Sequence, residues 1–210
     1  MKNLIIVIIL GVSLYYFKPG LFSFSNQGAF DNEGNPQAWI FTFDQCGRPC
    51  DDAISTLDKR INYTEYNVSQ ESGKQQLEKI GGSNRFPLLI IGNQTIKNND
   101  KWKIISTLAE VMGEQTLTPN ERRVLQGHFY DDGTPAIIMY GASWCGYCKQ
   151  MREYFNKNDI EFTELDGEGS ARSEYAALQG TGFPLIYIGY RRIQGANIAH
   201  FEKTMNELNL

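Results

Sequence analysis

The stretch AIIMYGASWCGYC, residues 136–148, is an apolar run that ends in a closely spaced pair of cysteines. The stretch AWIFTFDQCGRPC, residues 38–50, has the same design 99 residues earlier, counted from Cys46 to Cys145. Two further matching segments follow each stretch in the same order: INYTEYN (61–67) and FPLLIIG (86–92) in the first half, IEFTELD (160–166) and FPLIYIG (183–189) in the second. Segments that recur in one order at nearly constant spacing predict tandem copies of one domain.

Each copy follows the pattern strand, helix, strand, helix, strand, strand, helix, which is typical of an α/β fold. The apolar runs 38–43 and 136–141 predict a buried central strand, and the cysteines stand where that strand passes into a helix. Pro87 and Pro184 each open a later apolar strand, a position that proline tolerates. The other expected elements are strands at 63–68 and 162–166, helices at 72–80 and 170–178, turns at Gly92 and Gly189, and closing helices at 100–112 and 197–208.

The repeat sets the boundaries of the predicted domains at residues 37–113 and 135–210. Between them, residues 114–134 form a linker in which Thr118-Pro-Asn-Glu121 has the pattern of a helix capping box, so we expect a short helix there. Residues 25–36 are rich in Asn, Gly and acidic side chains and show no periodicity. Such a composition predicts a tether.

Residues 1–24 contain the apolar run LIIVIILGVSLYYF, from Leu4 to Phe17, between Lys2 and Lys18. This run predicts a hydrophobic helix that anchors the protein in a membrane, with a cleaved signal peptide as the alternative. A slight excess of positive charge before the run favours a cytoplasmic amino terminus. We therefore expect a membrane-anchored protein whose domains lie on the extracytoplasmic, periplasmic side, where disulfide chemistry is common.

The charge balance argues against nucleic acid as a partner. The chain has 20 Lys and Arg against 24 Asp and Glu, a net charge of -4, so the basic surface that nucleic-acid binding requires is lacking. The two histidines, His128 and His200, have no Cys, Asp or Glu at metal-ligand spacing. A zinc or copper site shared by the four cysteines would require the two copies to dock face to face. We therefore predict no metal site.

The second cysteine pair has the spacing that thiol–disulfide exchange needs. In Cys145-Gly-Tyr-Cys148 the first cysteine is expected in the loop after the strand and the second on the first helical turn. The free N–H groups and positive dipole at a helix start favour a thiolate, so we expect an exposed Cys145 sulfur with a lowered pKa. A substrate disulfide attacked by Cys145 would form a mixed disulfide that Cys148 resolves.

A Phe-Pro step recurs at matched positions of the two copies, Phe86-Pro87 and Phe183-Pro184. Its recurrence favours cis peptide bonds at both steps. A cis bond there would direct the backbone N–H and C=O of the phenylalanine toward the cysteines. A peptide-like substrate could then pair with that backbone as an added strand.

Both copies resemble glutaredoxins, within the thioredoxin superfamily, over about residues 36–113 and 134–210. The segment Ser143-Trp-Cys-Gly-Tyr-Cys-Lys149 carries the resemblance most clearly, because it joins a thioredoxin-like Trp-Cys-Gly start to a glutaredoxin-like Tyr-Cys end. The resemblance implies two thioredoxin-like (glutaredoxin-type) three-layer α/β/α domains with mixed four-stranded sheets. It also implies glutathione as a co-substrate and no tightly bound cofactor.

The resemblance assigns roles to single residues of the second copy. It implies Cys145 as nucleophile, Cys148 as resolving thiol and Tyr147 beside a bound glutathione. It also implies Phe183 and Pro184 as the backbone-pairing step, with Phe86 and Pro87 as their counterparts in the first copy. The family binds the glutathione carboxylate near a Gly-Gly-x-Asp motif. Here Gln194-Gly195-Ala196-Asn197 keeps Gly195 and places Asn197 where the acid would stand, which leaves glutathione specificity open.

The first copy departs from the family motif, because Cys46-Gly-Arg-Pro-Cys50 has three intervening residues. Helical phasing aligns Cys50 with Cys148 and makes the extra residue a lengthened turn. This pair is then either a second redox site or a degenerate copy. For the whole chain the sequence predicts a thiol–disulfide oxidoreductase that acts on a thiol- or disulfide-containing protein or glutathione. The alternative is a non-catalytic tandem module that binds a client protein or a metal.

Overall fold

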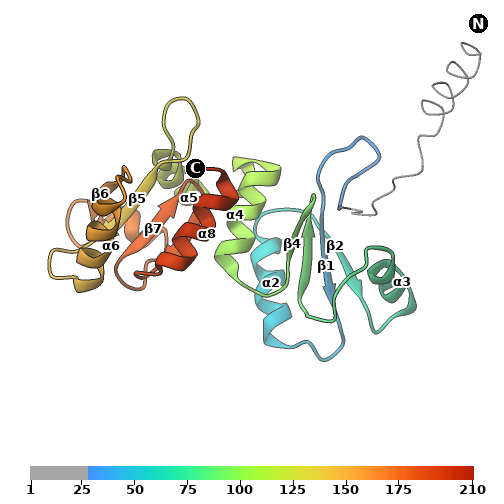
Figure 1. The fold of residues 1–210 in the computed structure, drawn as a ribbon. Helices are drawn as coiled ribbons and strands as arrows, with labels where there is room; N and C mark the ends of the chain where they lie inside the picture. Colours follow the sequence, from blue (N-terminus) through green and yellow to red (C-terminus); the bar gives the residue numbers. More distant parts are fainter. Residues whose placement is uncertain (1–27) are drawn as a thin grey trace, which may run out of the picture.

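The computed structural model describes residues 28–210, which form two four-stranded mixed sheets (Figure 1). In the first sheet the strand order is β2-β1-β3-β4, with β1 parallel to β2 and antiparallel to β3. In the second sheet β6, β5, β7 and β8 have the same order and directions. The strands are β1 (Ala38–Thr42), β2 (Thr64–Asn67), β3 (Leu88–Ile91), β4 (Gln94–Ile96), β5 (Ile137–Gly141), β6 (Thr163–Asp166), β7 (Leu185–Ile188) and β8 (Arg191–Gln194). The predicted α/β fold with two mixed sheets is confirmed.

Helices cover both faces of each sheet, which explains why the central strands are apolar along their whole length. In β5, Ile137 and Met139 belong to one apolar cluster and Ile138 and Tyr140 to the other, because alternate side chains point to opposite faces. The helices are α2 (Arg48–Asp58), α3 (Glu71–Lys79), α4 (Lys101–Met112), α6 (Gly146–Lys157), α7 (Arg172–Ala177) and α8 (Ile198–Leu208).

The predicted linker is built into the second core. It contains the short helices η1 (Glu114–Thr116), α5 (Pro119–Leu125) and η2 (Gln126–His128). The predicted capping box is present, since Thr118 accepts from the backbone of Glu121 and Glu121 accepts from that of Thr118. Val124 and Leu125 of α5 lie in the same apolar cluster as Tyr140 of β5. The segment therefore covers a sheet face as well as connecting the two units.

The repeat also extends upstream of the first strand of each sheet. Residues 28–36, most of the predicted tether, form a turn in which Phe30 and Pro36 are bridged, and Phe129 and Pro135 are bridged in the same way. Gly34 and Gly133 stand at matched positions of these turns with φ of 86° and 83°, which glycine adopts without strain. The hydrophobic segment 1–24 lies outside the described residues. Every helix within 28–210 is too short or too polar to cross a bilayer.

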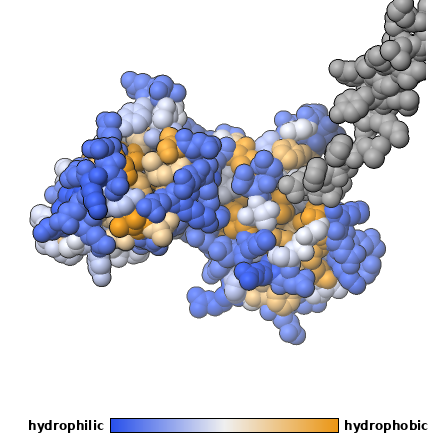
Figure 2. Space-filling model, viewed as in Figure 1, coloured by the Kyte–Doolittle hydropathy of each residue, from blue (hydrophilic) through white to orange (hydrophobic). Residues whose placement is uncertain are grey.

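The two units form two lobes that meet at α4, and most of the visible surface is hydrophilic (Figures 1 and 2). Arg191 of β8 forms an ion pair with Glu110 of α4. The guanidinium of Arg192 lies 4.3 Å from the ring centroid of Trp102, also on α4. The matched hairpin of the first unit has Asn93-Gln94-Thr95 in place of Tyr190-Arg191-Arg192.

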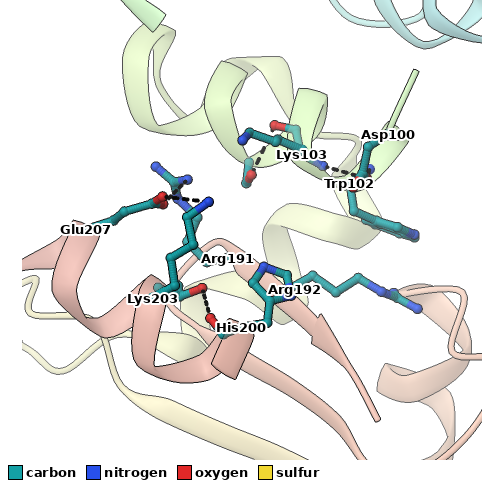
Figure 3. Close-up of a pocket in the computed structure, with 10 residues that line it drawn as sticks. Asp100, Trp102, Lys103, Arg191, Arg192, His200, Lys203 and Glu207 are labelled. Atoms are coloured by element: carbon teal, nitrogen blue, oxygen red, sulfur yellow. Dashed lines mark hydrogen bonds and ion pairs between the residues drawn. The ribbon is translucent and has the colours of Figure 1, made fainter. Parts of the chain in front are cut away.

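A pocket opens at this junction between α4, β8 and α8 (Figure 3). Much of its charge is already neutralised, because Arg191 and Lys203 both pair with Glu207. Arg192 donates to the backbone carbonyls of Leu178 and Gln179. The charged side chains that line it are Asp100, Lys103, Arg191, Arg192, Lys203 and Glu207.

A buried ion pair between Arg60 and Glu121 joins the end of α2 to α5. Both guanidinium ends donate to the carboxylate, at 2.7 and 2.9 Å, and the side chains are only 5% and 4% exposed. We expect Arg60→Ala to lower the free energy of unfolding by about 3–5 kcal/mol, because Glu121 is left buried and unpaired. Urea denaturation measures this change.

The exposed pair of Lys203 with Glu207 provides the control. Lys203→Ala should cost less than about 1 kcal/mol. Replacing Arg60 and Glu121 together by methionine should recover much of the loss, since no unpaired charge then remains. Equal losses for Arg60→Ala and Lys203→Ala would contradict this account of the pair.

His128 supplies a second test, at acid pH. It is buried, its Nε2 lies 2.9 Å from the hydroxyl of Tyr140, and burial lowers its pKa to about 4. The unfolded chain takes up this proton near pH 6.5 and the folded chain does not. Stability should therefore fall by about 3 kcal/mol between pH 6.5 and 4, with no contribution above that range.

Urea denaturation at pH 7 and pH 4 should show a smaller pH dependence for His128→Leu than for the unmodified chain. His200 is exposed, so His200→Gln should leave the dependence unchanged. An undiminished pH dependence in His128→Leu would show that another group causes the acid sensitivity.

Candidate functional site

The second cysteine pair lies where β5 passes into α6, as the sequence predicts. Cys145 is the N-cap of α6, and its Sγ accepts the backbone N–H of Cys148 at 3.0 Å. Cys148 is the third residue of the helix and is fully buried. The two cysteines form a disulfide with a Cα–Cα distance of 5.2 Å. A sulfur at the N-cap thus meets one of the N–H groups that a helix start leaves unpaired.

The exposed Cys145 sulfur that the sequence predicts is not observed, since Cys145 is only 5% exposed. The reason is local packing, because Cys145 is bonded to Cys148 and belongs to the apolar cluster with Ala142. The exposed groups at this end of the helix are the aromatic side chains beside the cysteines. Trp144 is 68% and Tyr147 is 67% exposed.

The predicted cis bonds are present at both Phe86-Pro87 and Phe183-Pro184. The ring of Phe183 lies with its centroid 6.1 Å from that of Trp144 and 4.7 Å from that of Tyr175. The residue before Pro184 is therefore packed beside the residue before Cys145. The first unit has a related contact, with the ring centroids of Phe43 and Phe86 5.5 Å apart.

A groove that sequence reasoning missed runs along one side of Phe183. It lies between the turn after β6 and helix α7. The Nε1–H of Trp144 donates to Glu168, one of the residues that line the groove, at 2.7 Å. The only sequence signal is the Gly-Glu-Gly turn at 167–169, which does not by itself predict a groove. The groove is lined by Gly167, Glu168, Arg172, Tyr175, Ala176, Gly180 and Phe183.

The other predicted binding residues lie on the hairpin and helix that follow Pro184. Gly195 has a left-handed φ of 75° and donates its N–H to the carbonyl of Pro184 at 2.8 Å. Asn197 is the N-cap of α8, where its Oδ1 accepts the N–H of His200. Asn197 thus already has a structural partner. Tyr147 projects from α6, on a separate element.

The first cysteine pair has the same place on its helix but different capping. Cys50 is the third residue of α2, as Cys148 is of α6, so the alignment of these two cysteines is confirmed. Cys46 and Cys50 form a disulfide with a Cα–Cα distance of 5.7 Å. The N-cap is Gly47, with φ of 59° and no side-chain hydrogen bond, and Cys46 is half-buried. Within residues 28–210 no group of three or more His, Cys, Asp or Glu side chains could hold a metal ion.

Comparisons with known proteins find glutaredoxin and thioredoxin-like relatives. A family model described as glutaredoxin matches residues 137–193. A glutaredoxin from Pseudomonas aeruginosa is 30% identical over 69 residues, which are 31% of this chain and 82% of the relative. Thioredoxin-like 3-3 from Arabidopsis thaliana is 39% identical over 57 residues, 25% of this chain and 44% of that protein. A crystal structure of a buckwheat glutaredoxin–glutathione complex is 20% identical, with 42% of this chain and 86% of that one covered and a TM-score of 0.32.

Gly167 gives a test of the packing around Phe183. A Cβ atom at this position would lie 2.5 Å from Cε1 of Phe183, so Gly167→Ala must push the ring away from its place. We expect the rate constant kcat/KM of disulfide reduction to fall roughly tenfold or more, because small displacements near reacting groups are costly.

Gly127→Ala is the matched control, since a Cβ there meets no atom within 4 Å. It should leave kcat/KM unchanged, and thermal unfolding should show that both variants are folded. If Gly167→Ala keeps full activity while folded, the position of the Phe183 ring does not matter for turnover.

Proposed function

Because the chain belongs to the glutaredoxin family, we propose that its second unit is a thiol–disulfide oxidoreductase with Cys145 as nucleophile and Cys148 as resolving thiol. One observation supports these roles above all: the N–H of Cys148 meets Sγ of Cys145 at 3.0 Å. A donor fixed at that sulfur would stabilise the Cys145 thiolate after reduction. The buried Cys148 is then held within bonding distance of the sulfur it must attack.

The proposed exchange has two steps. In the reduced enzyme the Cys145 thiolate attacks one sulfur of a substrate disulfide, a new S–S bond forms, and the other substrate sulfur leaves as a thiolate. Cys148 then loses its proton and attacks the Cys145 sulfur, which releases the second substrate thiol and restores the Cys145–Cys148 disulfide. Two electrons have passed to the substrate. The reverse sequence oxidises a dithiol.

The surroundings of Phe183 support a substrate that is an extended peptide or glutathione. The backbone of Phe183, beside Pro184, is the proposed site of strand pairing, with Gly195 and Asn197 beyond it. The groove along Phe183 is lined by Arg172, whose positive charge suits a substrate carboxylate, and by the aromatic side chain of Tyr175. No tightly bound cofactor enters this scheme.

We propose further that residues 1–24 anchor these domains to a membrane on its extracytoplasmic side. The apolar run from Leu4 to Phe17 and its flanking lysines support this location. Within each cysteine pair the two sulfurs form a disulfide, which agrees with an oxidising compartment.

Single-cysteine variants, made on a chain that also carries Cys46→Ser and Cys50→Ser, test the catalytic roles. Cys145→Ser should abolish turnover of a small disulfide substrate, because the attacking sulfur is lost. Cys148→Ser should accumulate a mixed disulfide with the substrate on Cys145, because the resolving step is blocked. Mass spectrometry of the intact protein detects this adduct, and the reduced Cys145→Ser chain should show none at the substituted position.

Ser143→Ala, beside the motif, should keep full turnover and serves as the control. Unchanged turnover in Cys145→Ser would remove the catalytic role of the second pair. If that variant lost only the capture of a client protein, the chain would be the non-catalytic binding module.

A further inference from the structure

The two cysteine pairs occupy matched helices, so their surroundings can be compared position by position. In α6 the capping atom is the sulfur of Cys145 itself, which accepts the N–H of Cys148. In α2 no side chain caps the helix, and the N–H of Cys50 goes instead to the carbonyl oxygen of Gly47 at 3.0 Å. The extra residue of the first motif thus moves Cys46 one position outside the helix, and the N–H of Cys50 is no longer free for its sulfur.

The first turn of α2 also has one donor fewer. Pro49 stands directly before Cys50, where Tyr147 stands before Cys148. Proline has no N–H, whereas the backbone N–H of Tyr147 points out of the start of α6. A negative charge on Cys46 therefore gains less from its helix than one on Cys145.

Side-chain charges at matched helical positions add to this difference. Asp51 follows Cys50 and Lys149 follows Cys148, so the two positions have opposite charge. Asp51 lies in the first turn of α2, whose other charged member is Arg48, while the first turn of α6 has no acidic residue. Lys149 is exposed and only 3.8 Å from Glu153, so its effect is modest. The difference in side-chain charge and the difference in backbone donors therefore both favour a thiolate on Cys145 over one on Cys46.

From these contrasts we infer that the Cys46–Cys50 pair has the lower reduction potential and is the reductant of the Cys145–Cys148 disulfide. The inference rests on the proposed function of the second pair. A disulfide becomes a stronger oxidant when its reduced form is stabilised. The reduced second pair gains the N–H of Cys148 at its thiolate, whereas in the first pair the matched N–H of Cys50 goes to the carbonyl of Gly47. Cys46 is half-buried and Cys145 is buried, so Cys46 is the more exposed of the two leading cysteines.

The transfer between the pairs balances without another reactant. The Cys46 thiolate attacks Sγ of Cys145, which forms a mixed disulfide and releases Cys148 as a thiolate that takes up a proton. Cys50 then loses its proton and attacks the sulfur of Cys46. The Cys46–Cys50 disulfide forms and Cys145 leaves as the thiolate that accepts the N–H of Cys148. Two electrons pass from the first pair to the second.

Two double variants of the full chain isolate the pairs. Cys145→Ser/Cys148→Ser keeps the first pair and is fully reduced before mixing, and Cys46→Ser/Cys50→Ser keeps the second pair and is oxidised. After they equilibrate, alkylation and mass spectrometry give the redox state of each. We expect an equilibrium constant of at least about 10 in favour of the reduced second pair, which corresponds to about 30 mV. Starting from the opposite redox states should lead to the same ratio.

Charge variants test the cause. Asp51→Lys, made on the chain that keeps the first pair, should lower the equilibrium constant roughly twofold, because a cation then stabilises the reduced first pair. Glu78→Lys makes the same change of charge on the exposed side of α3 and should leave the constant unchanged.

The outcomes separate the two proposals. An equilibrium constant of 1 or less overturns the inference but leaves the oxidoreductase activity of the second pair intact. A second pair that is inert toward dithiothreitol and glutathione disulfide as well overturns the proposed function itself. Equilibration that reaches the expected ratio supports both.

Discussion

The N–H of Cys148 bonded to the sulfur of Cys145 is the contact on which the proposed chemistry of this chain depends, and the sheet fixes its position. β5 is buried on both faces, between the apolar cluster that contains α6 and the cluster that contains α5 and α7. Its side chains cannot shift register by one residue without exchanging these two faces. The end of β5, and therefore the first turn of α6, is thus held by the packing of the entire second unit. A helix start held in this way keeps its free N–H groups at one place, and the cysteine in the N-cap position receives them.

Much of this arrangement could be predicted from the sequence, because it depends on patterns that are local. The repeated apolar strands, the Phe-Pro steps and the capping box of Thr118 each identify an element from a few adjacent residues. Other features depend on contacts between distant residues. The burial of Cys145 results from its place in the cluster with Ala142, and the groove beside Phe183 forms only when α7 packs against the turn after β6. The polar composition of residues 28–36 predicts a tether, whereas the structure has a turn there. Gly34 and Pro36 of this turn match Gly133 and Pro135 of the second copy.

Divergence between the two copies is concentrated where their surroundings differ. The hairpin of the second unit has Tyr190, Arg191 and Arg192 where the first unit has small polar residues, and these three side chains contact α4 and η1. Ion pairs and an arginine stacked on Trp102 are directional contacts, so they fix how the hairpin meets the helix. The edge strand β8 is thereby covered, and an uncovered edge strand would offer its backbone to other chains. This hairpin of the second unit therefore contributes directional contacts to the junction, while the strand order of both sheets is the same.

The same reasoning explains how one added residue can change a cysteine pair without changing its fold. The insertion between Cys46 and Cys50 falls before the buried face of α2 begins, so Ala53 and Leu57 keep their places in the apolar cluster of the first sheet. No side chain caps this helix, and the N–H of Cys50 is satisfied by the carbonyl of Gly47, whose φ of 59° glycine allows. Because the N–H of Cys50 goes to this carbonyl, it is not available to the sulfur of Cys46. The core tolerates this change because packing depends on residues 53 and 57, while the inferred redox behaviour of the pair depends on residues 46 to 51. Two units with one fold can therefore differ in redox behaviour through the capping of a single helix.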